Sequence, residues 1–392
     1  MAKIVFFCIP AHGHTNPTLG VVRELVSLGH EVLYYSYNML KEKIENTGAK
    51  FVSCDDYDME QKLSPEDGAR LGKDLAFSTK ILVDTTLALD DMVCSQIKEL
   101  QPDCIVADSM AIWGKCVALK FGIPFISSTT TFAFNQHSAK IMKQSIGQIF
   151  GMIFSMGKIQ KDIIRLQNKG YPINNVLDII KNDDNTDTIV YTSPEFQPCS
   201  ETFSDKYTFI GPSIRPITDE IVKTHKKLIY ISMGTVINNN AGFYHNCIKA
   251  FADTDFQVIM SVGNLTDMTK FKNLPENIFV YQNVDQIAVL SKADVFISHC
   301  GMNSVNESLY YGVPLVMFPQ TPEQGGVANR VNQLKAGIML KKNTVKNIQN
   351  AVKSLIDDGE YRKNAISISD GFKKCSGVKG AVEKILNICK KN

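Results

Sequence analysis

Short apolar runs alternate with longer stretches of helical spacing from one end of the chain to the other. The strands expected from these runs in the first half lie at 3–9, 31–36, 103–107, 124–127, 188–191 and 207–210. Those expected in the second half lie at 228–232, 256–261, 278–281, 295–298 and 315–318. Helical spacing fills several of the intervals, for example 113–120 and 17–28, which Gly29 ends. Such alternation is typical of α/β domains with parallel sheets.

The alternation is interrupted by a segment with two prolines and few apolar side chains, at 211–220. This composition indicates a connection between domains rather than a strand or a helix. We therefore expect a linker at 213–220 between a first domain at 1–212 and a second at 221–375, with a C-terminal helix in 376–392. The predicted fold class is α/β, with two Rossmann-like parallel-sheet domains facing across a cleft.

The composition narrows the possible partners and the compartment. The 392 residues carry 42 basic and 40 acidic side chains, a net charge of +2, so nothing indicates a nucleic-acid partner. No segment approaches the roughly 20 apolar residues that cross a bilayer, and the apolar run at the start is too short for a signal peptide. The ten cysteines are scattered without a C-x-x-C pair, which predicts reduced thiols, no zinc site and a cytoplasmic protein.

The most informative segment, 295–324, reads VFISHCGMNSVNESLYYGVPLVMFPQTPEQ. It predicts a strand, a tight polar turn, a helix from about 303 to 312, a second strand and a polar loop. The first turn of a helix presents backbone N–H groups that lack helical partners, and His299, Asn303 and Ser304 add side-chain donors at the same place. That combination suits a diphosphate. Glu307 lies near the same helix start and can reach the hydroxyls of an attached ribose.

A second candidate site lies where two predicted strands of the first half end. His14 follows Gly13 beyond the first strand, and Asp108 ends the strand DCIVAD. Loops at the carboxyl ends of parallel strands are where open α/β sheets place ligands. If the two strands are near neighbours, the carboxylate can accept a hydrogen bond from His14 Nδ1–H and leave Nε2 as a base for a hydroxyl. His12 is a competing candidate for this base.

Each of these assignments has a structural alternative. His14 can be a loop histidine that caps the following helix, and Asp108 can be a helix N-cap. The region 131–169, in which methionines and phenylalanines such as Phe132 and Phe134 are interleaved, can pack the core or form an adaptable apolar wall for an acceptor. The polar, turn-rich segment 55–74 is expected to be a surface loop.

The order His-x-Gly, Asn-Ser, Glu, Pro, Pro-Gln and Glu-Gln within 295–324 resembles the nucleotide-sugar signature of family-one inverting UDP-glycosyltransferases, in particular their bacterial macrolide-type branch. The resemblance implies a GT-B fold whose last helix returns to the first domain. It also implies that the motif Gly-His-x-x-Pro carries the catalytic base, His14, with Asp108 as its partner. The first domain would bind the acceptor, and the second would bind the nucleotide sugar.

The donor site collects residues from several strand ends. A small hydroxyl residue and a glycine after the first strand of the second domain allow close approach of phosphate oxygens, although an ordinary turn would look the same. The resemblance implies that Glu323 and Gln324 bind hydroxyls of the donor sugar; the alternative is a solvated loop. The donor-binding candidates are Ser232, Gly234, Thr235, Val284, Gln286, His299, Gly301, Asn303, Ser304, Glu307, Glu323 and Gln324.

Two positions depart from the pattern of the family. The base-side motif, usually aromatic-x-Pro-Gln, reads Asn283-Val284-Asp285-Gln286, so it lacks both the aromatic stacking platform and the proline. The departure leaves the preference for UDP over dTDP open. Cys300 stands where a second glycine is common, and a side chain there can narrow the phosphate pocket.

The sequence thus predicts a cytoplasmic, metal-independent, inverting glycosyltransferase. It would move a hexose, with glucose favoured, from UDP to a hydroxyl of a small apolar acceptor such as a macrolide or flavonoid. No cofactor is expected besides the donor substrate. One alternative is a nucleotide-sugar epimerase of the same architecture, for which Glu323 is the obvious acid–base candidate. The other is a non-catalytic nucleotide-sugar binder, which would fit if His14 and Asp108 lay far apart.

Overall fold

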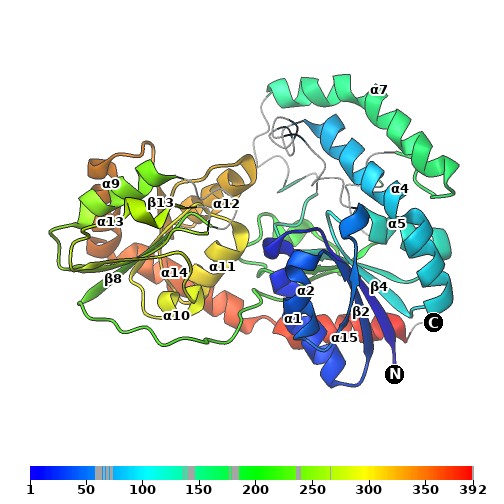
Figure 1. Ribbon diagram of the computed structural model, residues 1–392, viewed down its shortest axis with the longest axis horizontal. Helices are drawn as coiled ribbons and strands as arrows, with labels where there is room; N and C mark the ends of the chain where they lie inside the picture. Colours follow the sequence, from blue (N-terminus) through cyan, green and yellow to red (C-terminus); the bar gives the residue numbers. More distant parts are fainter. Residues whose placement is uncertain are drawn as a thin grey trace. The chain divides into compact units, whose positions relative to one another are not determined.

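The computed structural model describes residues 1–57, 64, 67, 70, 74–135, 137–138, 146–175, 178, 185–234, 240–264 and 266–390. The chain divides into two compact units, each built on its own parallel sheet (Figure 1). The first unit contains Met1–Ser213 together with Ser376–Asn392, and the second contains Ile214–Cys375. Two Rossmann-like α/β units are the fold class that the sequence predicted.

The first unit has a sheet in the order β3-β2-β1-β4-β5-β6-β7, with every described pairing parallel. β1 pairs with β2 on one side and with β4 on the other, so the strand order reverses between β1 and β4. Ligands of open α/β sheets bind at the carboxyl ends of the strands at such a switch point. The strands are β1 (Lys3–Phe7), β2 (Glu31–Ser36), β3 (Lys50–Ser53), β4 (Cys104–Asp108), β5 (Phe125–Thr129), β6 (Asp187–Val190) and β7 (Tyr207–Phe209).

Side chains of alternating strand positions bury two separate cores, one on each face of this sheet. Val5 and Phe7 face one core together with residues of α4, α5 and α7, whereas Ile4 and Phe6 face the other with residues of α1 and α15. Buried on both faces, the strands read as continuous apolar runs, which is why the sequence revealed them. The helices are α1 (His12–Ser27), α2 (Lys41–Glu45), α4 (Leu75–Leu100), α5 (Ile112–Phe121), α7 (Ile146–Asn168) and α15 (Gly377–Cys389).

The second unit repeats this plan with the order β10-β9-β8-β11-β12-β13, again parallel, and its switch point lies between β8 and β11. Its strands are β8 (Lys227–Ser232), β9 (Phe256–Ser261), β10 (Ile278–Tyr281), β11 (Val295–Ser298), β12 (Leu315–Met317) and β13 (Gly337–Met339). Its helices are α9 (Ala241–Phe251), α10 (Gln286–Leu290), α11 (Met302–Tyr310), α12 (Pro322–Gln333), α13 (Val345–Asp357) and α14 (Gly359–Lys374).

The structure differs from the sequence-based expectation in several places. β3 and β13 were not predicted, because no residue of β3 is fully buried and β13 has only three residues. α1 begins at His12, five residues before the predicted start at 17, and contains Pro17 beyond its first turn. Glu323 and Gln324 lie in the first turn of α12 and not in a loop, since Pro322 occupies the first helical position and Thr321 caps the helix. The segment expected as a linker, 213–220, falls almost wholly within the second unit.

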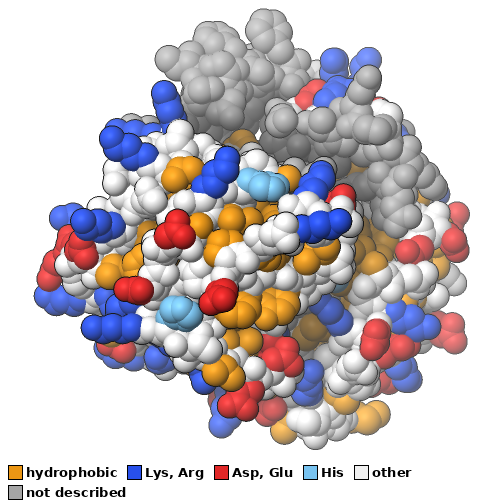
Figure 2. Space-filling view, turned by 60° about the vertical axis from the view of Figure 1, so that its left-hand side comes forward, with side chains coloured by type: hydrophobic (Ala, Val, Ile, Leu, Met, Phe, Trp, Pro, Cys, Tyr) orange, Lys and Arg blue, Asp and Glu red, His pale blue; other side chains and the backbone are white. Residues whose placement is uncertain are grey.

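The region 131–169 gives a mixed outcome. Phe132 is buried and its ring lies 5.4 Å from that of Phe196, which is core packing, whereas Phe134 is exposed. Met142 and most of the segment 55–74 lie outside the described residues, as do the side chains of Met152 and Met156. None of the described helices is both long and apolar enough to span a bilayer. Figure 2 shows acidic and basic side chains interspersed over the visible face.

Candidate functional site

The first site lies at the switch point of the first unit, where His14 and Asp108 meet. His14 lies in the first turn of α1, directly after β1, and Asp108 is the last residue of β4. His14 Nδ1 lies 2.8 Å from Asp108 Oδ2. The carboxylate side chain is 1% exposed and the imidazole 21% exposed, so the base is reachable while its partner is enclosed. The adjacency of β1 and β4 is what brings the two residues together.

Asp108 has a second fixed contact, through its other oxygen. Oδ1 accepts a hydrogen bond of 2.8 Å from the backbone N–H of Met110, which folds the chain back after β4. α5 begins only at Ile112 and is preceded by Ala111, so Asp108 is not the N-cap of that helix. His14 is not the residue before α1 either; Ala11 holds that position. The geometry therefore favours a paired His–Asp couple over the two capping alternatives.

Two further residues bear on this site. Thr130, which the sequence analysis did not single out, follows β5 and places Oγ1 3.2 Å from His14 Nδ1. His12, the competing candidate, lies 3.4 Å from Lys43 Nζ through its Nδ1. Burial, aided by the Lys43 charge, lowers the pKa of His12. Of the two histidines, His14 is the one whose described contacts include a carboxylate, so it is the better candidate for the base.

Large apolar side chains are exposed along the same edge of the sheet. Met39 follows β2, Met110 follows β4 and Phe134 follows β5, with exposed fractions of 56%, 45% and 51%. Met110 is also the residue whose N–H holds Asp108. Exposed apolar side chains near a polar reactive group are typical of a binding site for an apolar molecule.

The second site lies at the switch point of the second unit, where Ser232 ends β8 opposite Ser298 at the end of β11. His299 follows β11, and its ring packs closely against Gly234 and Gly301. A Cβ on Gly234 would lie 2.6 Å from the ring, and one on Gly301 would lie 2.7 Å from Nε2. Gly234 also has a φ of +79°, which side-chain-bearing residues rarely adopt. Both glycines are therefore needed for the ring to occupy this position.

Burial keeps the imidazole of His299 neutral. Removal from water lowers the pKa of His299 to about 4, although the Ser232 carbonyl offsets part of the effect. Nδ1 is buried without a hydrogen bond of good geometry to any described residue. A neutral imidazole still donates one N–H, so His299 can donate to a phosphate oxygen. α11 begins directly beyond it, with Gly301 as N-cap and Asn303 and Ser304 in its first turn.

Cys300 occupies a strained backbone position between these residues. Its φ is +70°, in the left-handed region where glycine is favoured. The side chain is fully buried, and Sγ lies 3.7 Å from the Ser298 carbonyl. The sequence left open whether this side chain narrows the phosphate pocket. Because the thiol is directed into the protein interior, it does not narrow the surface that faces a ligand.

Gln286, Ser304 and Glu307 form one hydrogen-bonded group between α10 and α11. Gln286 Nε2 donates to Ser304 Oγ at 3.3 Å and to Glu307 Oε2, while its Oε1 accepts from Tyr230. Burial raises the pKa of Glu307, and the Gln286 contact opposes this only in part. The sequence-predicted residues of this group are thus brought together. Val284 is half-buried two residues before Gln286, and Thr235 lies outside the described residues.

Asp285, which replaces the proline of the usual motif, has a structural role that the sequence did not reveal. Oδ2 accepts from Thr218 N at 2.7 Å and Oδ1 pairs with Arg215 at 2.5 Å. Oδ1 also caps α10 at Ile287 N. Burial alone would raise the pKa of Asp285, but the Thr218 and Arg215 contacts outweigh it and hold the pKa well below its usual range. The segment predicted as a linker is therefore anchored to the second unit.

The two residues predicted to contact the donor sugar differ in their surroundings. Gln324 is half-buried, and its Oε1 accepts from Gln320 N at 2.7 Å, which holds the amide in place. Glu323 is exposed in the first turn of α12. Both follow β12, which pairs with β11, so they lie at the same edge of the sheet as His299.

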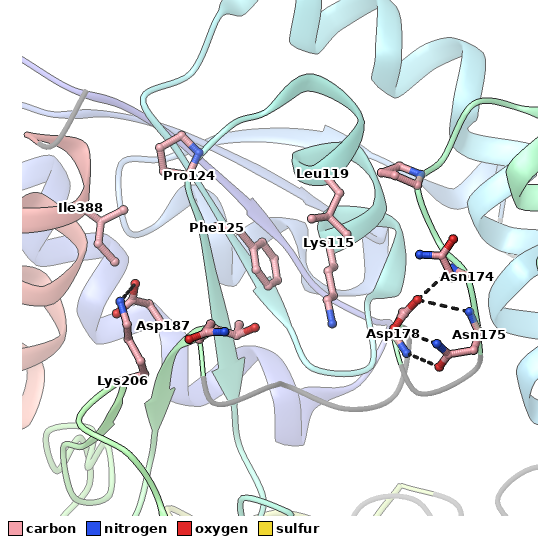
Figure 3. Close-up of a pocket in the computed structure, with 13 residues that line it drawn as sticks. Lys115, Leu119, Pro124, Phe125, Asn174, Asn175, Asp178, Asp187, Lys206 and Ile388 are labelled. Carbon is pink, nitrogen blue, oxygen red and sulfur yellow. Dashed lines mark hydrogen bonds and ion pairs between the residues drawn. The ribbon is translucent and has the colours of Figure 1, made fainter.

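A pocket of about 760 Å³ lies elsewhere in the first unit, at the amino ends of β5 and β6 (Figure 3). Phe125 and Leu119 line it together with Lys115, and the Asp187–Lys206 ion pair lies at its edge. It is at the opposite edge of the sheet from His14 and takes no part in that site. Within the described ranges, no group of three His, Cys, Asp or Glu side chains is arranged to hold a metal ion.

The two α/β units thus have a carboxylate-paired histidine at one switch point and a helix start beside a buried histidine at the other, an arrangement suited to group transfer. Comparison with known proteins gives the class of this protein. Residues 218–375 match the family described as UDP-glucoronosyl and UDP-glucosyl transferase. NDP-glycosyltransferase YjiC of Bacillus licheniformis is 34% identical over 394 residues, which are 97% of this chain and 96% of that protein. The chain therefore belongs to the UDP-glycosyltransferase family and is a glycosyltransferase.

Other relatives extend the likeness to the macrolide-type branch and to the fold. Demethyllactenocin mycarosyltransferase of Streptomyces fradiae is 27% identical over 400 residues, 98% of this chain and 86% of that protein. The crystal structure of the calicheamicin glycosyltransferase superposes with a TM-score of 0.85 at 24% identity, covering 100% of this chain and 99% of that one. These similarities establish the GT-B fold, and the named relatives lend no support to an epimerase.

Proposed function

We propose that this glycosyltransferase moves a hexose, with glucose favoured, from UDP to a hydroxyl of a small apolar acceptor, with inversion at the anomeric carbon. The observation that carries the proposal is the 2.8 Å contact between His14 Nδ1 and Asp108 Oδ2, with the imidazole accessible and the carboxylate enclosed. An imidazole whose Nδ1–H is held by a carboxylate can take a hydroxyl proton on Nε2. The match to a family described by UDP-glycosyl transfer supports the choice of nucleotide.

The reaction is a single displacement. The acceptor oxygen forms a bond to the anomeric carbon as its proton passes to His14 Nε2, and the bond from that carbon to the diphosphate oxygen breaks. The electron pair leaves with UDP, and the proton stays on the imidazole. Asp108 stabilises the imidazolium through Nδ1–H. Attack from the face opposite the leaving group converts an α-linked donor into a β-glycoside.

The leaving diphosphate needs stabilisation of the negative charge that develops on it. The first turn of α11 offers backbone N–H groups, and His299 adds a neutral donor beside them. Glu307, which accepts from Gln286, would accept from ribose hydroxyls in this proposal, and Gln324, which accepts from Gln320 N, would contact hydroxyls of the sugar. We propose that these groups suffice without a metal ion, so transfer should persist in excess chelator.

The acceptor class follows from the apolar side chains at the edge of the first sheet. Met39, Met110 and Phe134 are exposed beyond the strands that flank the His–Asp pair. Flexible methionine and flat phenylalanine side chains adapt to varied apolar surfaces. A macrolide or flavonoid carrying a hydroxyl meets this description.

The test combines product analysis with one substitution. UDP-glucose is offered with a panel of phenols and macrolides; mass spectrometry identifies the products, and the proton coupling at the anomeric carbon reports its configuration. His14→Ala is expected to lower kcat by about 10²- to 10⁴-fold, with the Kd for UDP unchanged. Full transfer by His14→Ala would contradict the assignment of the base. Isomerised UDP-sugar in the absence of acceptor would instead favour an epimerase, and UDP-sugar binding without turnover a non-catalytic binder.

A further inference from the structure

Side chains from the ends of three neighbouring strands of the first sheet meet at Nδ1 of His14, where Asp108 and Thr130 both contact this nitrogen. His14 follows β1, Asp108 ends β4 and Thr130 follows β5, and these strands are adjacent in the sheet. Nδ1 of His14 lies 2.8 Å from Asp108 Oδ2 and 3.2 Å from Thr130 Oγ1. Thr130 is 3% exposed, so its hydroxyl does not compete with bulk water for this contact.

The direction of the Thr130 contact follows from the charge on its neighbour. A carboxylate oxygen has no proton to donate, so its 2.8 Å contact with Nδ1 requires that Nδ1 carries the hydrogen. An Nδ1 that already carries hydrogen cannot accept from a hydroxyl. Thr130 Oγ1 therefore acts as a second acceptor for the same N–H, and the longer distance makes it the weaker of the two.

We propose that Thr130 is a positioning residue for the catalytic base, a role that rests on the proposed function of His14. Two acceptors on adjacent strands restrict rotation of the imidazole and hold Nε2 toward the substrate. The same pair of acceptors stabilises the imidazolium that forms when the acceptor proton is taken. Thr130 touches no reacting atom and acts through His14.

Two other ionisable groups near the pair, Cys8 and Tyr191, do not titrate in the range that matters. Burial, together with the Asp108 charge, raises the pKa of the Cys8 thiol, and burial raises that of the Tyr191 hydroxyl. Both stay neutral between about pH 5 and 9. His12 is nearby, but burial and Lys43 lower its pKa. Thr130 contacts the ring of His14, whereas His12 lies beside Lys43, so a change in the acidic limb on substitution of Thr130 is assigned to His14.

The experiment replaces the hydroxyl by a methyl group of similar shape. In Thr130→Val, kcat should fall by about three- to tenfold, with little change in the KM for UDP-sugar, because one hydrogen bond to the base is lost. The acidic limb of the pH–rate profile should move to lower pH by about half a pH unit, since the imidazolium loses an acceptor. Thr130→Ser keeps the oxygen and should restore both. Thr129→Val, the same change one residue earlier on the strand, is the matched control.

The outcomes separate this proposal from the function on which it rests. An unchanged pH profile and kcat in Thr130→Val, in an enzyme that transfers sugar and loses transfer on His14→Ala, would overturn the role of Thr130 alone. A purely structural role would lower the melting temperature and leave the acidic limb in place. Absence of transfer by the wild-type enzyme would refute the proposed function instead. If Thr130→Val does not fold, the same comparison between Thr130→Ala and Thr130→Ser decides the question.

Discussion

The position of His299 beside two glycines gives a prediction whose size can be worked from the structure. In Gly301→Ala, the new Cβ would lie 2.7 Å from His299 Nε2, and an ordinary contact needs about 3.4 Å or more, so the ring must move by about 0.7 Å. The φ of Gly301, −59°, is allowed for alanine, so no backbone strain is added. A shift of this size lengthens an N–H···O bond from about 2.8 to about 3.5 Å, which breaks it.

The loss of one hydrogen bond to a charged phosphate costs about 1.5–3 kcal/mol. The Kd for UDP should therefore rise by about 10- to 150-fold, measured by isothermal titration calorimetry. Gly242→Ala is the control, because a Cβ there meets nothing within 4 Å in the same unit. His299→Ala should weaken UDP to a similar degree. The double variant should be no weaker than His299→Ala, since both changes remove one contact.

Two results would refute this reasoning. The first is a Kd for UDP in Gly301→Ala within about twofold of the wild-type value, with Gly242→Ala also unchanged. The second is full additivity in the double variant, which would show that Gly301 acts on UDP by a route other than His299. Circular dichroism of each variant establishes that the fold is retained, so that a loss of binding is assigned to the site.

Three further predictions concern the anchor, the pH dependence and the acceptor. Asp285→Ala removes the partner of Arg215, which is half exposed and stays hydrated, and also the cap of α10. It should lower the free energy of unfolding by about 1–3 kcal/mol in urea titrations and increase hydrogen exchange around Thr218. The folded-state pKa of His299 is about 4 and the unfolded value is 6.5, so the unfolded state binds the extra proton first as the pH falls. The free energy of unfolding should therefore fall between pH 6.5 and 4 by up to about 3 kcal/mol. This loss should be absent in His299→Gln. Met110→Ala should raise the KM for an apolar acceptor by about five- to tenfold with the Kd for UDP unchanged; an unchanged KM would remove Met110 from the acceptor site.

Most of the strands, and the contact between His14 and Asp108, could be predicted because buried parallel strands are apolar and polar residues at their ends are conspicuous. β2, β9, β10 and β11 lie within their predicted bounds. The pairing of His14 with Asp108 was conditional on strand order, which no local pattern encodes and which the adjacency of β1 and β4 supplied. The start of α1 was missed because a proline normally marks the first turn, yet Pro17 lies further in.

The remaining contacts depend on tertiary structure. From the sequence, Asp285 was interpreted only as the loss of the usual proline. Its structural role depends on Arg215 and Thr218, which are far away in the sequence. Thr130 gave no signal, because a threonine after a buried strand is ordinary and only the neighbouring strand ends give it a partner. The low pKa of His299 likewise follows from burial that the motif alone does not show.

The membership of α15 in the first unit has a consequence for how the protein is made. Val382, Ile385 and Ile388 of this helix complete the core on one face of the first sheet, together with Ile4 and Phe6 of β1. β1 and α15 thus line the same core although the whole second unit lies between them in the sequence, so all of that unit is translated after β1 and before α15. Until α15 is made, part of the apolar face of the first sheet has no cover from this helix.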